Sequence, residues 1–379
     1  MKIGIFGGTF NPVHNGHIDI CKHLKEKLNF DFIYIVPTYK TPGFKFDPER
    51  IDPIHRLKMV EAAVKETKLK WLKVSKIEFE KKDISYTYLT IEHFRKTYPK
   101  ADLYFILGND RYITFDTWKN PNSITTNAKL VVYKRGHHLM TPTTTQRLIY
   151  VDDKPFNISS TDIIANLEWN KIPLASRKYI SKHHLYLKTL AFRQLGVDRY
   201  KHTIAVAINA KRLAEISGYR NPQKAYDVGL AHDLFKNFDE KWQVDYIHMN
   251  SDYLIPPGPT LHSYTADIWF RKEYLMKDEE FLSAIRKHSL CALEMSQLDK
   301  LIYVADKTSM DRITKSDISM RRLAYSNLDL TFKKLFKQYC ELILNKNNLL
   351  FPDTRELYDN LFIEQKKEVK TYGNFKKLS

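Results

Sequence analysis

Short apolar runs alternate with amphipathic stretches over the first 186 residues of the chain. The apolar runs predict strands, and the stretches between them predict helices with one apolar face. The predicted strands are residues 2–6, 32–36, 72–79, 103–107, 129–133 and 148–151, and the predicted helices are 16–28, 53–66, 86–97 and 160–167. Because strands and helices alternate, this half is expected to form an α/β fold, a doubly wound parallel sheet that binds ligands beyond the carboxyl ends of its strands.

The pattern changes to long helical periodicities after about residue 187. The stretch "HTIAVAINAKRLAEI" spaces its apolar residues at helical intervals, as at Ile204, Ala207 and Ile208. Almost no strand alternation is found between residues 190 and 362. We therefore predict an α/β domain over residues 1–187, an all-α domain over 190–363 and a basic tail over 364–379, with a short and ordered boundary between the two domains.

Chain length and cysteine usage narrow the class of protein. A chain of 379 residues is long enough for two or three domains that each bury a core. No run approaches the roughly 18 apolar residues of a membrane span, and the N-terminus lacks the pattern of a secretory signal. Cys21, Cys291 and Cys340 are too scattered for a disulfide framework. These features predict a cytoplasmic protein without a membrane partner.

The formal net charge of +17 suits binding to phosphate groups. The positive charge is dispersed along the chain and concentrates locally only between Lys366 and Lys377. This pattern favours a solvated basic surface and phosphate-bearing substrates over dedicated binding of RNA or DNA.

The stretch "GIFGGTFNPVHNGH", which ends at His17, joins the first predicted strand to the first predicted helix. Gly7 and Gly8 let the backbone approach a ligand closely. The free N–H groups and positive dipole at the helix start favour an anion there. His14 and His17 can donate hydrogen bonds to phosphate oxygens. Two histidines without other signals would more often have structural roles, with His14 capping the helix and His17 packing in the core.

This stretch resembles the "GTF(D/N)P-x-H-x-GH" signature of the nucleotidyltransferase superfamily with an HxGH motif. The later stretch "NISSTDII" resembles the second hallmark of that superfamily, ISST-x-x-R. The resemblance implies that Ser159, Ser160 and Thr161 begin a helix and hold the β- and γ-phosphates of ATP.

The chain departs from this second hallmark at one position. Ile164 stands where the superfamily has an arginine, and an isoleucine cannot pair with phosphate. The triphosphate is therefore expected to be held either more weakly or by another cation, such as Lys134 or Arg135.

Within the superfamily, this half resembles the nicotinate mononucleotide adenylyltransferases. "PTYKTP" puts Lys40 at the position of the phosphate-contacting lysine of that family, and "SYTYLT" puts Thr87 where a threonine helps to hold the nicotinate ring. "FILGNDRYITFDTW" supplies Gly108 and Asp110 near the nucleotide and Trp118 near the pyridine, although Trp118 could instead fill the core.

The resemblance implies that ATP and nicotinate mononucleotide give deamido-NAD and pyrophosphate, with Mg²⁺ arriving together with ATP. The attacking phosphate is already ionised, so catalysis is expected to consist of positioning and charge neutralisation. The implied catalytic residues are His14, His17 and Lys40. The implied nucleotide-binding residues are Gly7, Gly8, Thr9, Phe10, Asn11, Thr87, Gly108, Asp110, Trp118, Ser159, Ser160 and Thr161. Nicotinamide mononucleotide and pantetheine phosphate stay open as other acceptors.

The helical half carries an adjacent His-Asp pair in "GLAHDLFKNF", on a helix that its apolar residues predict to be buried. An unpaired buried carboxylate costs several kcal/mol, and a bound metal removes that cost. The order His…His-Asp…His…His…Asp resembles the HD superfamily of metal-dependent phosphohydrolases, and more closely the symmetrical diadenosine tetraphosphate hydrolases. The implied metal ligands are His202, His232, Asp233, His262, His288 and Asp306, and Lys236 is the implied second-site catalytic residue.

Imidazole and carboxylate ligands suit iron, manganese or zinc, and the resemblance favours iron. The implied reaction splits a dinucleoside polyphosphate such as diadenosine tetraphosphate into ADP. A competing interpretation is a nucleotide- or RNA-binding regulator with a non-catalytic helical half. The six intact ligand positions favour the enzyme over that regulator.

Overall fold

The computed structural model describes residues 1–42, 48–135 and 147–364 of the chain. It divides into two compact units, Met1–Tyr186 and Leu187–Ser379, which are described separately. The predicted basic tail, residues 364–379, lies outside the described residues except for Glu364. Among the described residues, no helix is both long enough and apolar enough to cross a membrane.

The first unit is built on a sheet of six parallel strands in the order β3-β2-β1-β4-β5-β6. The strands are β1 (Lys2–Gly8), β2 (Phe32–Pro37), β3 (Leu72–Val74), β4 (Asp102–Gly108), β5 (Lys129–Tyr133) and β6 (Leu148–Val151). The chain winds outward in one direction from β1 through β2 to β3 and in the other from β4 through β5 to β6. The strand order therefore reverses between β1 and β4, at a point where α/β sheets bind ligands.

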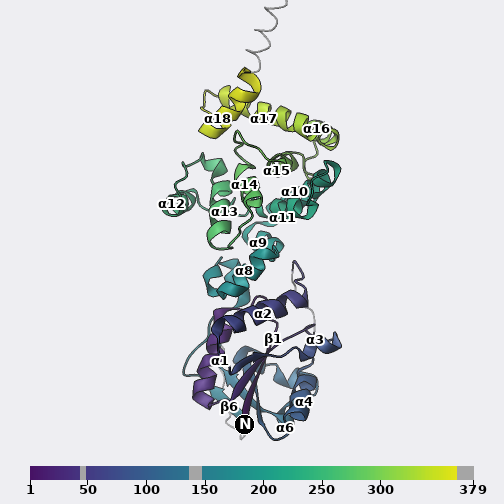
Figure 1. The fold of residues 1–379 in the computed structure, drawn as a ribbon, viewed down its shortest axis with the longest axis vertical. Coiled ribbons are helices and arrows are strands. Elements are labelled where there is room, and N and C mark those ends of the chain that lie inside the picture. The colour runs from purple at the N-terminus through teal and green to yellow at the C-terminus, as the bar shows by residue number, and fades with distance from the viewer. Residues whose placement is uncertain (43–47, 136–146, 365–379) are drawn as a thin grey trace, which may run out of the picture. The chain divides into compact units, whose positions relative to one another are not determined.

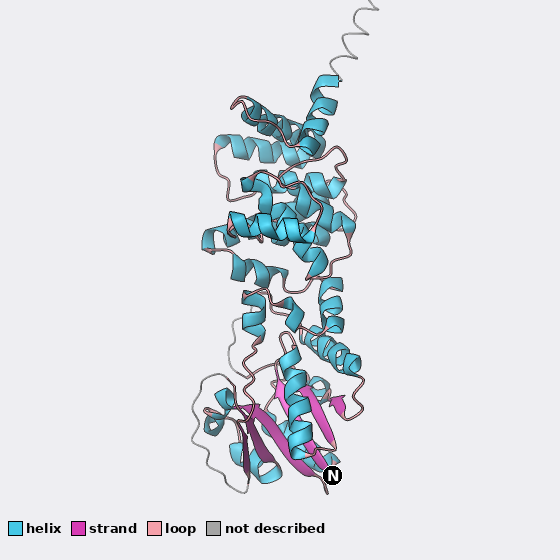
Figure 2. Ribbon diagram, turned by 90° about the vertical axis from the view of Figure 1, so that its left-hand side faces the viewer, coloured by secondary structure: helices cyan, strands magenta, loops and turns pink. Residues whose placement is uncertain are grey.

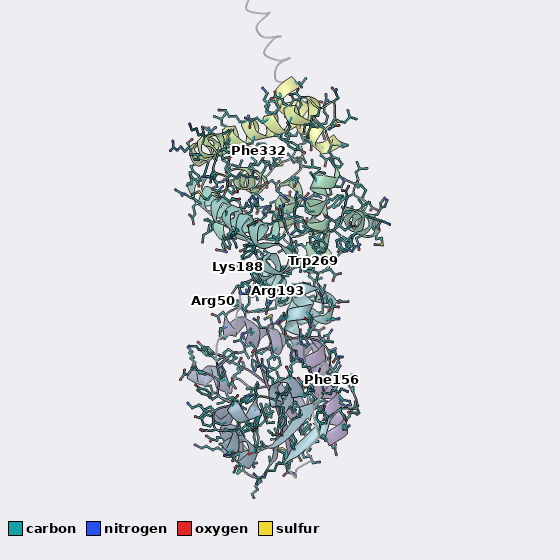
Figure 3. The ribbon with its side chains drawn as sticks, turned by 180° about the vertical axis from the view of Figure 1, so that it is seen from behind. Arg50, Phe156, Lys188, Arg193, Trp269 and Phe332 are labelled. Carbon is teal, nitrogen blue, oxygen red and sulfur yellow. The ribbon has the colours of Figure 1, made fainter. Side chains whose placement is uncertain are left out.

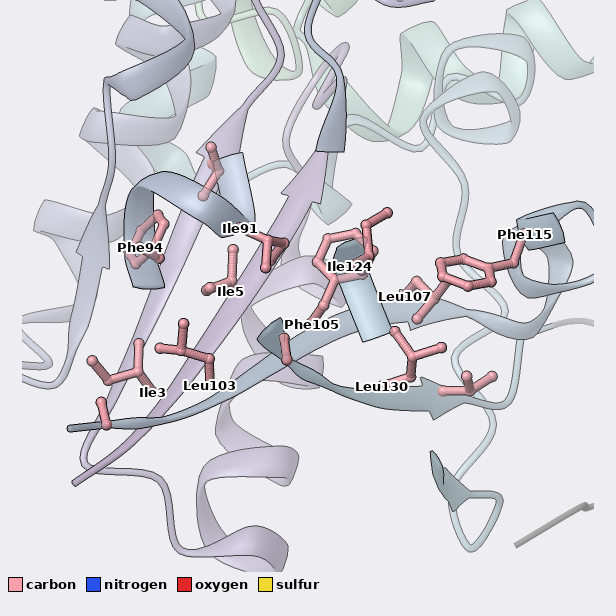
Figure 4. Packing of buried hydrophobic residues seen from close by; sticks show 14 of the residues in the cluster. Ile3, Ile5, Ile91, Phe94, Leu103, Phe105, Leu107, Phe115, Ile124 and Leu130 are labelled. Carbon is pink, nitrogen blue, oxygen red and sulfur yellow. The ribbon is translucent and has the colours of Figure 1, made fainter. Parts of the chain in front are cut away.

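Helices lie on both faces of the sheet, with α1 and α4 on opposite sides (Figure 1). The helices and 3-10 turns of this unit are α1 (Asn15–Leu28), α2 (Pro53–Thr67), α3 (Ile77–Lys81), α4 (Thr87–Thr97), α5 (Asn109–Tyr112), η1 (Phe115–Thr117), α6 (Pro121–Asn127), α7 (Ser160–Ala165), η2 (Trp169–Lys171) and α8 (Leu174–Lys182). Ile3, Ile5 and Leu103 point to the face covered by α4 and α6, where they pack with Ile91 and Ile124 (Figure 4). This arrangement confirms the predicted α/β class.

One predicted strand was too long. The expected strand over residues 72–79 ends at Val74, and α3 follows it. The strand β3 lies at the sheet edge and pairs only with β2, and the hydrogen bond from Ser75 N–H to Ile35 O is the last link between them. Beyond that bond the short helix α3 buries Ile77. The apolar residues at positions 77 and 79, which suggested a strand, therefore belong to a helix.

The second unit is entirely helical over residues 187–364, as predicted (Figure 2). Its helices are α9 (Leu187–Gln194), α10 (Val197–Ile216), α11 (Pro222–Ala231), α12 (Glu240–Asn250), η3 (Gly258–Thr260), α13 (Leu261–Lys272), α14 (Glu279–Lys287), α15 (Gln297–Lys307), α16 (Lys315–Ser326), α17 (Leu328–Leu344), α18 (Pro352–Asp359) and the π-helical turn η4 (Asn360–Glu364). Aromatic residues link its layers: Trp269 packs on Phe235 with ring centroids 5.7 Å apart, and Phe332 packs on Tyr303 at 5.4 Å (Figure 3).

Candidate functional site

A cavity of about 710 Å³ lies in the first unit at the carboxyl ends of β1 and β4. Its volume is in the range of pockets that hold drug-sized ligands. All twelve predicted nucleotide-binding residues line its wall, together with one of the two histidines: Gly7, Gly8, Thr9, Phe10, Asn11, His17, Thr87, Gly108, Asp110, Trp118, Ser159, Ser160 and Thr161. The fold thus brings together residues that are up to 154 positions apart in the sequence.

Two glycines at the ends of strands shape this cavity. A Cβ atom on Gly8 would lie 2.9 Å from the ring of Phe10. A Cβ atom on Gly108 would lie 2.4 Å from Oδ1 of Asp110. Both approaches are closer than any normal carbon contact, so a side chain at either position would push a wall residue into the cavity.

The two histidines of the opening motif lie against each other, with ring centroids 3.6 Å apart. His14 precedes α1, and its main-chain N–H donates to Nδ1 of His17 at 3.1 Å. Because a main-chain N–H can only donate, the neutral His17 ring carries its proton on Nε2. His14 is 2% exposed and lies behind His17, and both of its ring nitrogens lack a hydrogen-bond partner.

Both imidazoles are neutral at neutral pH. Burial, assisted by the charge of Arg135, lowers the pKa of His14 to about 3. Burial also lowers the pKa of His17 well below its ordinary value, and the neighbouring His14 and Arg135 act in the same direction. In the free protein these rings are therefore hydrogen-bonding groups and carry no positive charge.

Positive charge at the cavity wall comes, among the described residues, from Arg111, Lys119 and Arg135. Arg135 lies 3.5 Å from the Asp110 carboxylate, and its guanidinium donates to the main-chain oxygen of Ile158 at 3.3 Å. It therefore reaches the segment that leads into α7. Ile164, which replaces the arginine of the resembled signature, is 4% exposed and supplies no charge.

The start of α7 is tied to the opening motif. Ser159 caps this helix by accepting a hydrogen bond from Asp162 N–H at 3.1 Å. Ser160 donates to the main-chain oxygen of Pro12 at 2.8 Å. The two hallmark stretches are thus in direct contact.

Lys40 lies away from the cavity, whereas Trp118 has two sets of contacts. The Lys40 side chain is exposed and does not line the cavity, and its main chain is joined to Ser85, whose N–H donates to Lys40 O at 2.8 Å. Trp118 lines the cavity and also packs on Phe105 and Phe115, with centroids 6.1 and 5.5 Å apart. Trp118 therefore packs in the core and also forms part of the cavity wall, and its position near the pyridine stays a prediction.

Sequence reasoning missed the buried residues that hold the cavity loops. Arg56 of α2 is 5% exposed and donates to the main-chain oxygens of Thr9 at 2.7 Å and Tyr39 at 3.0 Å. Tyr186 donates its hydroxyl to Asn11 Oδ1 at 2.6 Å. Neither residue belongs to a recognisable motif, so their role depends on tertiary contacts.

The second unit gathers the six predicted metal ligands from five helices and their ends. His202, His232 and Asp233 have ligand atoms within 4.8 Å of one another, and so have Asp233, His262 and His288. Asp306 Oδ1 lies 3.1 Å from His202 Nε2. Asp233 is therefore shared by both groups.

Hydrogen bonds behind the rings orient this cluster. His232 Nδ1–H donates to Gly229 O at 2.7 Å, and His288 Nδ1–H donates to Ile285 O at 2.6 Å. Their Nε2 lone pairs therefore face the cluster, and His232 Nε2 is buried without a hydrogen-bond partner. An orphaned lone pair beside a shared carboxylate fits a divalent metal ion.

Neighbouring groups keep the Asp233 carboxyl ionised. Burial alone would raise the pKa of Asp233, but His232, His262 and the neighbouring histidine His288 hold it well below its ordinary value. Arg199, which the sequence did not single out, lies 2.7 Å from Asp233 Oδ2. Lys236 donates to Pro259 O at 2.8 Å and to His262 Nδ1 at 3.3 Å.

Two family models match the chain. A cytidylyltransferase-like model matches residues 5–166, and an HD domain model matches residues 199–311. These ranges contain the cavity motifs and the six-residue cluster respectively, so the HD domain accounts for a divalent metal site in the second unit.

Curated relatives match most of the chain or about half of it. A protein of Mycoplasma pneumoniae named as a probable nicotinate-nucleotide adenylyltransferase/Ap4A hydrolase is 29% identical over 343 residues, which is 88% of this chain and 97% of the relative. A probable nicotinate-nucleotide adenylyltransferase of Bacillus pumilus is 34% identical over 190 residues, which is 49% of this chain and 98% of the relative. A crystal structure of a predicted HD superfamily hydrolase involved in NAD metabolism, from Clostridium acetobutylicum, is 27% identical, with a TM-score of 0.43 over 46% of this chain and 93% of that chain.

The identity to the Bacillus pumilus protein extends over almost its whole length, and it covers the unit that holds the cavity. The chain therefore belongs to the nicotinate-nucleotide adenylyltransferase family and carries an HD domain in its second unit.

Proposed function

We propose that the first unit transfers the adenylyl group of ATP to nicotinate mononucleotide, giving deamido-NAD and pyrophosphate. The observation that carries the proposal is a single cavity lined by His17, the start of α7 and Trp118. Such a cavity offers hydrogen-bond donors for phosphates at one place and an aromatic surface for a flat ring at another. The name of the Bacillus pumilus relative supports this acceptor.

In this reaction an oxygen of the acceptor phosphate forms a bond to the α-phosphorus of ATP. The bond between that phosphorus and the bridging oxygen to the β-phosphate breaks, and pyrophosphate leaves with the electron pair. The acceptor phosphate is ionised at neutral pH, so the protein needs no general base. Its tasks are alignment of the two nucleotides and stabilisation of the charge that grows on the phosphates.

The donors of the cavity suit those tasks. His17 Nε2–H is proposed to donate to the α-phosphate, with His14 holding the tautomer through its main-chain N–H. Ser159, Ser160 and Thr161 are proposed to hold the β- and γ-phosphates, and Mg²⁺ arrives with ATP. Arg135 is proposed to replace the arginine that is absent at Ile164, because it lies beside the same segment.

An assay with three acceptors tests this proposal. The protein is incubated with ATP, Mg²⁺ and nicotinate mononucleotide, nicotinamide mononucleotide or pantetheine phosphate, and pyrophosphate release is measured. We expect the nicotinate acceptor to be preferred, and H17A to lower kcat by about 100-fold or more because a preorganised donor is lost. Transfer only to pantetheine phosphate, or a fully active H17A variant, would contradict the proposal.

We propose that the second unit hydrolyses a dinucleoside polyphosphate, with diadenosine tetraphosphate giving two ADP. The shared Asp233 and the orphaned His232 Nε2 carry this proposal, and the Mycoplasma pneumoniae relative supports the substrate by its name. In the reaction the oxygen of water bonds to one of the two central phosphorus atoms, and the oxygen that bridges them leaves with the other ADP.

His202, His232, Asp233, His262, His288 and Asp306 would hold the metal, and iron, manganese or zinc suits these ligands. The bound metal would supply a Lewis acid for the phosphate oxygens and for the attacking water. Lys236 and Arg199 stand beside the cluster and would bind the negative polyphosphate. We propose iron as the resident metal. We also propose that the protein is cytoplasmic, and its three free, buried cysteines support this location.

Metal analysis combined with product analysis tests the second activity. We expect at least one transition metal per chain after expression with added iron, and ADP as the sole nucleotide product. D233N should lose the bound metal and the hydrolytic activity but keep adenylyl transfer. H17A should lose adenylyl transfer but keep the bound metal and the hydrolytic activity. A metal-free protein after iron supplementation, or products AMP and ATP, would contradict the proposal.

A further inference from the structure

The cavity of the first unit has two chemically different ends. His17 and Ser159 line it where β1 and α7 meet, and both are hydrogen-bonding groups. Tyr86, Phe105 and Trp118 line it beside the start of α4, and the last two pack edge to face. A flat heteroaromatic ring therefore suits the second end, and phosphate groups suit the first.

The cations of the wall divide between these ends. Arg135 lies beside Asp110 and Ile158, next to the histidines. Arg111 directly follows Asp110 in α5, and Asp110 is the carboxylate beside Arg135. Lys119 directly follows Trp118, and its Nζ lies 4.3 Å from the centroid of the Tyr86 ring. Among the described cavity residues, Lys119 is thus the cation at the aromatic end.

Lys119 is available to a ligand. No carboxylate of the described residues lies within ion-pair distance of its Nζ, and the Tyr86 ring holds the ammonium group by a cation–π contact. The Glu78 carboxyl also lines the cavity. It accepts a hydrogen bond from Thr90 at 2.8 Å, and burial raises its pKa. Both effects weaken its repulsion of a negatively charged ring substituent.

We infer that Lys119 makes the first site selective for an acceptor with a carboxylate on its pyridine ring over one with a neutral carboxamide. The inference rests on the proposed adenylyl transfer and names a residue that sets its substrate class. Phosphate, ribose and pyridine are common to nicotinate and nicotinamide mononucleotide, so contacts to them bind both acceptors. The carboxylate alone carries an extra negative charge, which an ammonium group at the ring end attracts.

The test compares kcat/KM for the two mononucleotides in the full chain. In K119Q we expect the ratio of nicotinate to nicotinamide mononucleotide to fall by about 5- to 30-fold, which equals about 1–2 kcal/mol of selectivity. The change should appear in KM for nicotinate mononucleotide, because the contact involves no reacting atom. The KM for ATP should stay within about twofold of the unmodified protein.

Two variants provide controls. Lys129 of β5 also lies over an aromatic ring, 5.6 Å from the Tyr104 centroid, but it does not line the cavity, so K129Q should keep the ratio. R111Q removes a cavity cation from the phosphate end and should weaken ATP binding without changing the ratio.

If K119Q lowered kcat/KM equally for both acceptors, Lys119 would have only a structural role. That result would overturn the inference but not the proposed adenylyl transfer. An unchanged ratio in K119Q would overturn it in the same way. If the unmodified protein adenylylates neither mononucleotide, the proposed function fails and the inference falls with it.

Discussion

Replacing Gly229 by alanine tests how the fold holds His232, which we propose as a metal ligand. Gly229 is the point where α11 crosses α10, and a Cβ atom there would lie 2.5 Å from Cα and 3.0 Å from N of Ala207. Non-bonded carbon atoms normally sit about 3.5–4.0 Å apart, so the two helices would have to separate by about 1 Å. Overpacking of this kind costs about 1–3 kcal/mol, and the better helix propensity of alanine returns at most about 1 kcal/mol.

We therefore expect G229A to lose about 1–2 kcal/mol of unfolding free energy. For a domain of this size that loss lowers the Tm by about 2–8 °C. Metal affinity should also fall, by about tenfold or more, because Gly229 O accepts the hydrogen bond that orients His232. Thermal denaturation with and without added metal identifies the transition of the second unit, and titration with a chelator measures the metal affinity.

Two further variants make the test specific. G196A lies in the same unit, and its Cβ would meet nothing within 4 Å, so it should keep both Tm and metal affinity. The double variant G229A/A207G should not recover either quantity, because the nearest atoms belong to the main chain of residue 207. A G229A protein that melts and binds metal like the unmodified chain would refute the reasoning.

The remaining predictions concern both units. Because the pKa of His14 is lowered to about 3, the unfolded state binds a proton that the folded state lacks between pH 6.5 and 3, so stability falls as pH falls. His14 alone should lower the unfolding free energy by about 2 kcal/mol at pH 5 relative to pH 7.5. In H14Q the unfolding free energy, measured with urea, should depend less on pH over that range; the same pH dependence in both proteins would argue against a buried neutral ring. Asp311 Oδ2 lies 2.7 Å from His202 Nδ1, so D311N should weaken metal binding by about tenfold in a chelator competition, and unchanged affinity would exclude this orienting role. R135Q should raise KM for ATP by about tenfold with little change in KM for nicotinate mononucleotide, and a similar rise for both substrates would contradict its assignment to the triphosphate.

The fold was predictable where burial leaves a clear pattern. Strands β5 and β6 begin and end at the predicted residues because buried parallel strands are nearly continuous apolar runs. Short helices such as α5 and α6 were not predicted, because a helix of one or two turns has too few residues to show a period. The alternating apolar residues at positions 77 and 79 suggested a strand, but they lie in a short helix. The sequence does not show that β3 has no pairing partner beyond Val74, where the strand ends.

The candidate sites divide in the same way. The resemblance to a known family predicted which histidines of the second unit gather. The short opening motif kept His14 and His17 together, because both lie within the turn and the helix that follows it. The sequence did not predict the buried Arg56 or the proximity of Arg135 to α7, because both depend on segments brought together by the sheet. Lys40 is exposed and does not line the cavity, so its role in binding phosphate stays a prediction.

Histidine serves the two units in opposite ways, and the sequence alone does not distinguish them. In the first unit a main-chain N–H donates to Nδ1 of His17, which leaves Nε2–H as a donor suited to an anion. In the second unit His232 donates its Nδ1–H to a main-chain oxygen, which leaves the Nε2 lone pair suited to a cation. Burial keeps both rings neutral, since it lowers the pKa of each. The direction of one main-chain hydrogen bond therefore decides whether a buried imidazole presents an N–H or a lone pair at Nε2, and this direction depends on whether the partner is an N–H before a helix or a carbonyl within one.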